Sequence, residues 1–171
     1  RRTGGFRKYD LGINNTSRPN GFLKFQELTP HMSFTRFWNF DGVMETSFLH
    51  LHFMGEFEDS SSTGAWYDVK SERVFRTFSI SGIPVAPGRY DFSETNYSFR
   101  YNRSAPISFG VSTTAGGLFG GDIVTVRPSV RLRYQETLNL SLSYSRNDID
   151  LPAGSTITNL TSARIGYNLS P

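Results

Sequence analysis

Residues 123–147, IVTVRPSVRLRYQETLNLSLSYSRN, decide the fold of this chain. Apolar and polar residues alternate along both halves of the stretch, and the polar residues 135–137 separate the halves. A side-chain period of two is typical of β-strands, and the short connection predicts an antiparallel hairpin. The apolar rows are Val124, Val126, Val130, Leu132 and Tyr134, followed by Leu138, Leu140, Leu142 and Tyr144.

Both apolar rows of this hairpin end in a tyrosine. Aliphatic residues bordered by aromatic ones are typical of a strand that crosses a bilayer. A soluble sheet that buries one face produces the same alternation. The hairpin therefore predicts an antiparallel sheet with one apolar face, in either setting.

The rest of the chain repeats this alternation between turns rich in Gly and Pro, and no segment has helical spacing. We expect strands near residues 43–57, 72–81, 90–101, 107–111 and 159–168, and a polar loop at 58–71. Pro30 interrupts the aromatic-rich residues 22–40, which favours two short strands or an edge strand there. The sequence thus predicts one all-β domain over residues 1–171, an antiparallel meander of about 8–10 strands that forms a β-barrel or a barrel-derived curved sheet.

The composition excludes several classes of protein. The 171 residues include no cysteine, so disulfides and thiolate metal sites are excluded. No apolar run approaches the roughly 20 residues of a membrane helix, whereas a barrel dilutes its apolar residues with a polar inner face. The net charge of +3 is spread along the strands, so we expect no nucleic-acid partner. No cofactor is expected, and no small-molecule ligand is indicated.

Four segments in the second half resemble one bacterial family. They are GIPVAPGRY at 82–90, GGLFGGD at 116–122, RNDIDLPAG at 146–154 and the closing strand at 159–168. In this order they resemble the C-terminal β-barrel region of the domain-of-unknown-function 5916 family, over roughly residues 35–170. The resemblance implies an outer-membrane barrel of a Gram-negative bacterium without catalytic residues. The family's N-terminal carbohydrate-binding domain, of the family-9-like type, has no counterpart here, and the chain ends without the terminal aromatic strand of such barrels. We expect a fragment that lacks its closing strand or strands, or a shortened relative that forms no pore.

The leading hypothesis is a non-enzymatic outer-membrane β-barrel domain, in contact with lipid, with a structural, pore or surface-anchor role. The alternative is a soluble or peripheral β-sheet subunit that packs on a larger membrane protein complex at its periplasmic face. An enzyme is disfavoured, since no catalytic motif such as Gly-x-Ser-x-Gly is present.

The candidate site residues follow from strand phase. We expect the polar face, or lumen, to carry Arg73, Arg100, Arg127, Arg131, Arg133 and Arg164. We expect the aromatic border of the membrane at Tyr101, Tyr134, Tyr144 and Tyr167, and contact with a partner at Phe37 and Trp38. His50 and His52 share a face and form a weak candidate metal site, but the sequence marks no third ligand, and we expect no bound metal.

Overall fold

The computed structural model describes residues 5–21, 23–135 and 137–168. Three residues from the expected strands and turns, Phe22, Glu136 and Leu169, lie outside this range. Within it, no helix has the length and apolarity needed to cross a membrane.

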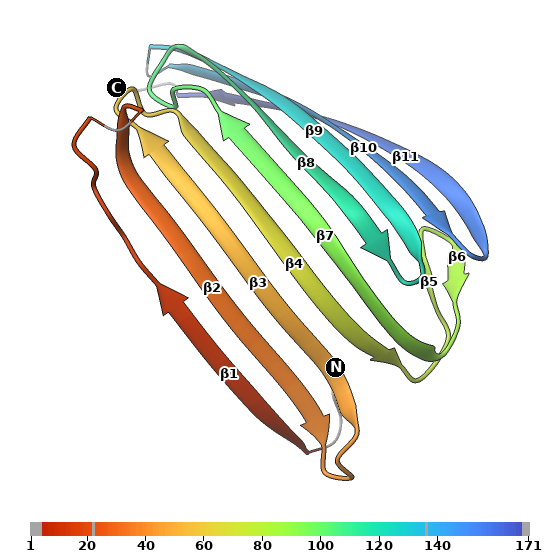
Figure 1. The fold of residues 1–171 in the computed structure, drawn as a ribbon. Helices are drawn as coiled ribbons and strands as arrows, with labels where there is room; N and C mark the ends of the chain where they lie inside the picture. The colour runs from red at the N-terminus through yellow and green to blue at the C-terminus, as the bar shows by residue number, and fades with distance from the viewer. Residues whose placement is uncertain (1–4, 22, 136, 169–171) are drawn as a thin grey trace.

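The described residues form one large sheet and one small hairpin. The strands of the large sheet are β1 (Phe6–Asn14), β2 (Phe25–Asn39), β3 (Met44–Phe57), β4 (Ser62–Val74), β7 (Gly88–Arg100), β8 (Ile107–Leu118), β9 (Gly121–Tyr134), β10 (Leu138–Leu151) and β11 (Gly154–Tyr167). They are antiparallel and follow one another in this order across the sheet (Figure 1). The hairpin of β5 (Phe78–Ile80) and β6 (Ile83–Val85) is inserted between β4 and β7.

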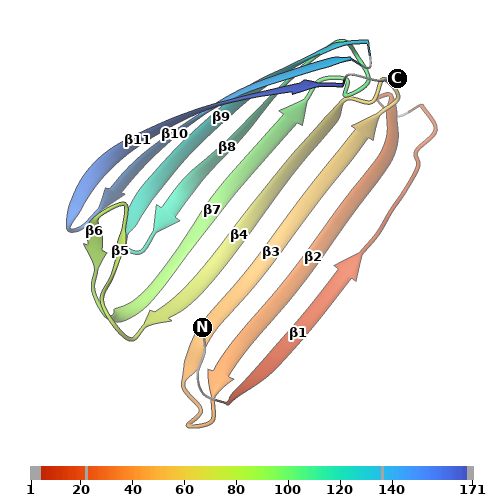
Figure 2. The same cartoon turned by 180° about the vertical axis from the view of Figure 1, so that it is seen from behind.

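The prediction of an all-β antiparallel meander is therefore confirmed. The sheet is curved but does not close into a barrel, because β1 pairs only with β2 and β11 pairs only with β10 among the large-sheet strands (Figures 1 and 2). The nine strands alternate in direction, so the two edge strands β1 and β11 run the same way.

The predicted hairpin is present as β9 and β10, with register from Asp122 opposite Asp150 to Tyr134 opposite Leu138. The turn that leads into β9 consists of Phe119 and Gly120, with φ of 46° and 85°. Positive φ at both positions is the requirement of a two-residue hairpin turn, which explains a glycine here.

Two expectations about strand positions are wrong. The expected loop at 58–71 is mostly strand β4, whose alternation is hard to see because Trp66 lies in its polar row. Pro30 does not divide residues 22–40, because it lies inside β2, which is an interior strand. The Pro30 carbonyl accepts a hydrogen bond from the Asn15 amide, so its backbone polar atoms point to the β1 side. Since β1 ends at Asn14, no ladder bond is lost there.

Residues paired across strands point to the same face, so the register divides the sheet into two faces. We call the face of Leu51 and Tyr67 the outer face, and the face of His50 and Asp68 the inner face. Four polar residues of the inner face are buried although the large sheet is a single layer, because side chains converge on the inside of a curve. These residues are Asp68, Asn96, Ser108 and Thr125.

A small apolar core covers one end of the inner face. Ile83 and Val85 of β6 are buried against Ile149 and Leu151 of β10. The hairpin β5–β6 is thus folded over the inner face, and the rest of that face is mostly polar, with a few aromatic side chains such as Phe37 and Trp66. Within the described part of the chain, no second layer covers the apolar side chains of the outer face.

Candidate functional site

The outer face exposes large apolar side chains on eight of the nine strands of the large sheet; on β2, Met32, Phe34 and Trp38 are half-buried. Tyr9 and Ile165, on the two edge strands, are each 71% exposed. Exposed members between them include Leu51, Phe53, Tyr67, Tyr97, Ile107, Phe109, Val124 and Leu142. Soluble monomers rarely expose contiguous apolar patches larger than a few hundred Å². This face therefore has the character of a contact surface.

The apolar residues of the outer face form a band that crosses the hydrogen-bonded rows obliquely. One row contains Leu11, Phe34, Leu49 and Val69, and it reaches the polar Ser93 on β7. Another row contains Ile107, Leu132, Leu140 and Ile165. The distance between the two rows can be counted along β7 and β8. The first row meets β7 at Ser93, and Phe99, six residues later, pairs with Val111 on β8. The second row meets β8 at Ile107, four residues beyond Val111 in the same direction, so the two rows are ten residues apart.

This displacement gives the tilt of the strands relative to the band. It is slightly more than one residue per strand over the eight steps from β1 to β11. With a rise of about 3.3 Å per residue and a strand spacing of about 4.8 Å, it corresponds to strands tilted by about 41° from the normal to the band. Strands in β-barrels, including those of the outer membrane, are tilted by a similar angle.

Aromatic side chains lie at both borders of the band. At one border Tyr134 and Tyr167 flank Leu138 in one row, and Tyr101 stacks on Phe109 with 5.1 Å between ring centroids. Tyr144 lies at the other border, where β10 continues with Arg146 and Asp148 on the same face. Its hydroxyl donates a hydrogen bond to Asn159 Oδ1 at 2.6 Å. All four tyrosines that the sequence singled out therefore lie on the outer face.

Phe37 and Trp38 point to opposite faces, so they do not form one contact surface. Trp38 lies on the outer face beside Tyr9, with 6.2 Å between the rings, at the same border of the band as Tyr144. Phe37 lies on the inner face, where its ring contacts Phe6 with 5.6 Å between centroids.

Five of the six candidate arginines lie on the inner face: Arg100, Arg127, Arg131, Arg133 and Arg164. The placement of Arg73 was wrong. It pairs with Arg89 in the same strand phase as Tyr67 and Val69, which puts it on the outer face beyond the apolar band. The sequence prediction began the strand at residue 72 and so had no earlier residues of β4 to fix its phase.

The inner-face arginines have neutral neighbours. Arg127 Nε donates to Ser145 Oγ at 3.2 Å, and Arg133 Nη2 donates to the Arg103 carbonyl at 2.8 Å. Arg100 and Arg131 line a hollow of about 280 Å³ together with four serines. Within the described ranges, none of the five makes an ion pair with a carboxylate. This part of the inner face is therefore cationic.

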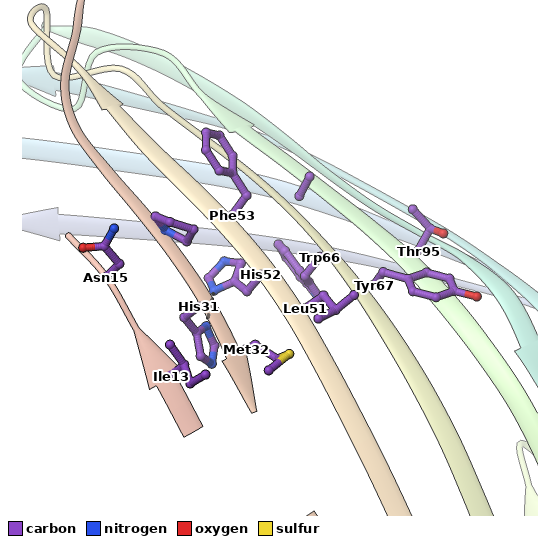
Figure 3. A pocket seen from close by; sticks show the side chains of 12 residues that line it. Ile13, Asn15, His31, Met32, Leu51, His52, Phe53, Trp66, Tyr67 and Thr95 are labelled. Carbon is purple, nitrogen blue, oxygen red and sulfur yellow. Dashed lines mark hydrogen bonds between the residues drawn. The ribbon is translucent and has the colours of Figure 1, made fainter. Parts of the chain in front are cut away.

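The other half of the inner face carries three histidines and the acidic side chains. His31 on β2 pairs with His52 on β3, and their Nδ1 atoms are 3.2 Å apart (Figure 3). His50 lies two residues from His52, and its Nδ1 is 2.5 Å from Asp68 Oδ1. One ring nitrogen from each histidine lies within 4.8 Å of the other two. Sequence analysis missed His31 because the register was unknown, and missed Asp68 because it was placed in a loop.

A further hollow of about 560 Å³ lies near the histidines. Its lining comes from both faces of the sheet, with Leu51 and Tyr67 from the outer face and His52 and Trp66 from the inner face (Figure 3). It is a gap among the side chains of a single layer, so we do not assign a ligand to it. Comparison of the chain with protein-family models, curated proteins and solved structures gives no significant match.

Proposed function

We propose that this chain forms the wall of an outer-membrane β-barrel with a structural, pore or surface-anchor role and no enzymatic activity. The observation that carries the proposal is the oblique apolar band. A planar slab of lipid crossed by tilted strands requires the apolar residues to shift along the strands from one to the next. A sheet that only buried one face against a flat partner would have no need of this shift.

The two aromatic borders support the same proposal, because aromatic girdles flank the apolar band of outer-membrane barrels. The polar inner face supports it as well, since the lumen of such barrels is polar. The resemblance of roughly residues 35–170 to a bacterial barrel family supports the outer membrane of a Gram-negative bacterium as the proposed location.

The free edges of β1 and β11 must be paired with further strands if this sheet is to form a closed barrel. An unpaired strand edge cannot face lipid, because its amides and carbonyls have no water to bond. The two edges run in the same direction, so antiparallel closure needs an odd number of further strands between them. In this proposal those strands come from outside the nine that the large sheet contains.

These same free edges favour a second candidate, a peripheral sheet subunit whose outer face packs on a membrane protein complex. The two candidates differ in what the outer face needs. A barrel wall needs lipid or detergent to fold, whereas a peripheral subunit folds in water and binds protein.

The experiment is refolding of the purified chain with and without phospholipid vesicles, followed by flotation and circular dichroism. The proposal predicts β-structure that floats with the vesicles and resists extraction by alkali. A folded monomer recovered from the aqueous fraction without detergent would exclude the barrel wall and leave the peripheral subunit.

A further inference from the structure

We propose that His31, His50 and His52 bind one divalent transition-metal ion on the inner face, with Asp68 as the residue that orients His50. This site is independent of whether the outer face contacts lipid, and so it goes beyond the proposed function.

The spacing of the three imidazoles matches a shared ion. Zinc–nitrogen bonds of about 2.0–2.1 Å in tetrahedral geometry separate the ligand nitrogens by roughly 3.4 Å. The Nδ1 atoms of His31 and His52 are 3.2 Å apart, and one ring nitrogen from each of the three histidines lies within 4.8 Å of the other two. Small ring rotations are therefore enough to bring three nitrogens onto one ion, without movement of the strands.

Asp68 completes the arrangement from the neighbouring strand. Its carboxylate bonds Nδ1 of His50, which leaves Nε2 of that ring to face an ion. Metal-binding histidines usually donate their second nitrogen to a carboxylate or carbonyl in this way. The Asp68 side chain is 10% exposed, and a carboxylate with so little contact with water is stabilised by a nearby cation.

The nearby lysine on the same strand does not neutralise Asp68. Lys70 is the nearest cationic side chain on the inner face of β4, and its Nζ pairs with Glu94 at 2.7 Å. Among the described residues, the one hydrogen bond or ion pair of the Asp68 carboxylate is with the His50 ring. A divalent cation among the three imidazoles would neutralise Asp68.

The ligand set indicates the class of ion. Imidazole nitrogens select zinc, copper, nickel and cobalt over magnesium and calcium, which prefer oxygen ligands. Three protein ligands leave a fourth position open toward the lumen side of the sheet. The ring of Trp66 packs edge-on against His52, with 5.6 Å between centroids, and restrains that ligand from the side.

The test uses the full chain without a histidine tag, folded in detergent micelles or vesicles, with Zn²⁺ as the titrant in calorimetry. We expect one ion per chain. His31→Gln, His50→Gln and His52→Gln should each lower the affinity by more than about 100-fold, and Asp68→Asn by about 10–100-fold, the range found for outer-shell partners. Ser33→Ala, which lies opposite His50 on β2, is the matched control and should change the affinity less than twofold.

A second measurement does not depend on the variants. Co²⁺ bound to the wild-type chain should give the intense visible absorption of a four-coordinate site, and Zn²⁺ should abolish it. The proposal is overturned if the folded wild-type chain takes up no more Zn²⁺ than a variant that lacks all three histidines. It is also overturned if each His→Gln variant keeps the wild-type affinity.

Discussion

Lysine placed on the outer face of β3 should destabilise the membrane-inserted state far more than lysine placed on its inner face. Leu51 lies between Leu49 and Phe53 in the apolar band, so it is at the middle of the expected bilayer depth. Met54 lies three residues further on and points to the inner face. The two side chains are similarly exposed, at 40% and 47%, so a difference between the two lysine variants would come from the surroundings of each face and not from burial within the chain.

The expected magnitude follows from the position of Leu51. A lysine at the bilayer midplane on the lipid face of a barrel costs about 2–4 kcal/mol. This is roughly 30- to 900-fold in the equilibrium between the folded and unfolded states. Met54→Lys faces the polar lumen and lies two residues from Glu56, so we expect a change within about 0.5 kcal/mol.

The assay is urea titration of both variants and the wild type in short-chain phosphatidylcholine vesicles, followed by tryptophan fluorescence. Equal changes in the free energy of unfolding for the two variants would refute the assignment of the outer face to lipid. Met54→Lys is the matched control, because its lysine lies on the inner face of the same strand.

Three further predictions follow. Arg131→Glu should shift the ion preference of single-channel currents from anions toward cations. Arg73→Glu, on the outer face, should leave the preference unchanged, and equal shifts for the two variants would contradict the placement of Arg131 in the pore. Gly121→Ala should cost about 1–3 kcal/mol, since a Cβ there would meet a backbone oxygen of the next strand at 1.9 Å, and Gly12→Ala, with its nearest atom at 3.9 Å, should be neutral by the same unfolding titration. Ile149→Ala should lower stability by about 2–4 kcal/mol and make residues 75–87 sensitive to protease, because this buried side chain holds the β5–β6 hairpin; unchanged proteolysis would count against that role.

The fold class could be predicted from the sequence because alternation is a local property. From Val124 to Tyr134 and from Leu138 to Tyr144 every second residue is apolar, and the turn between the two stretches is short, so strand type and pairing follow without tertiary information. Prediction was wrong where a strand's polar row contains a large aromatic residue, as at Trp66 in β4. It was also wrong at Pro30, because the missing amide of this proline lies beside the end of β1, where no ladder hydrogen bond is lost.

The candidate sites depended on information that one sequence does not contain. His31 and His52 become neighbours only through the register of β2 against β3. That register is set by the turn at residues 40–43, and each histidine lies eight residues from the strand end that this turn joins. Arg73 shows the same limit, because a strand that is started late has no apolar residues to fix its phase. The face of Tyr101, Tyr134, Tyr144 and Tyr167 could be predicted because each tyrosine ends or borders a clear alternation.

The central claim is that the outer face contacts lipid and the inner face does not, and the two tryptophans of the chain test it most directly. Trp38 lies on the outer face at the border of the apolar band, and Trp66 lies on the inner face beside His52. Two variants, Trp66→Phe and Trp38→Phe, leave one tryptophan each for quenching by vesicles of lipid brominated near the headgroup end of the acyl chains. The account predicts strong quenching of Trp38 and little quenching of Trp66. Equal quenching of both, or quenching of Trp66 alone, would contradict it.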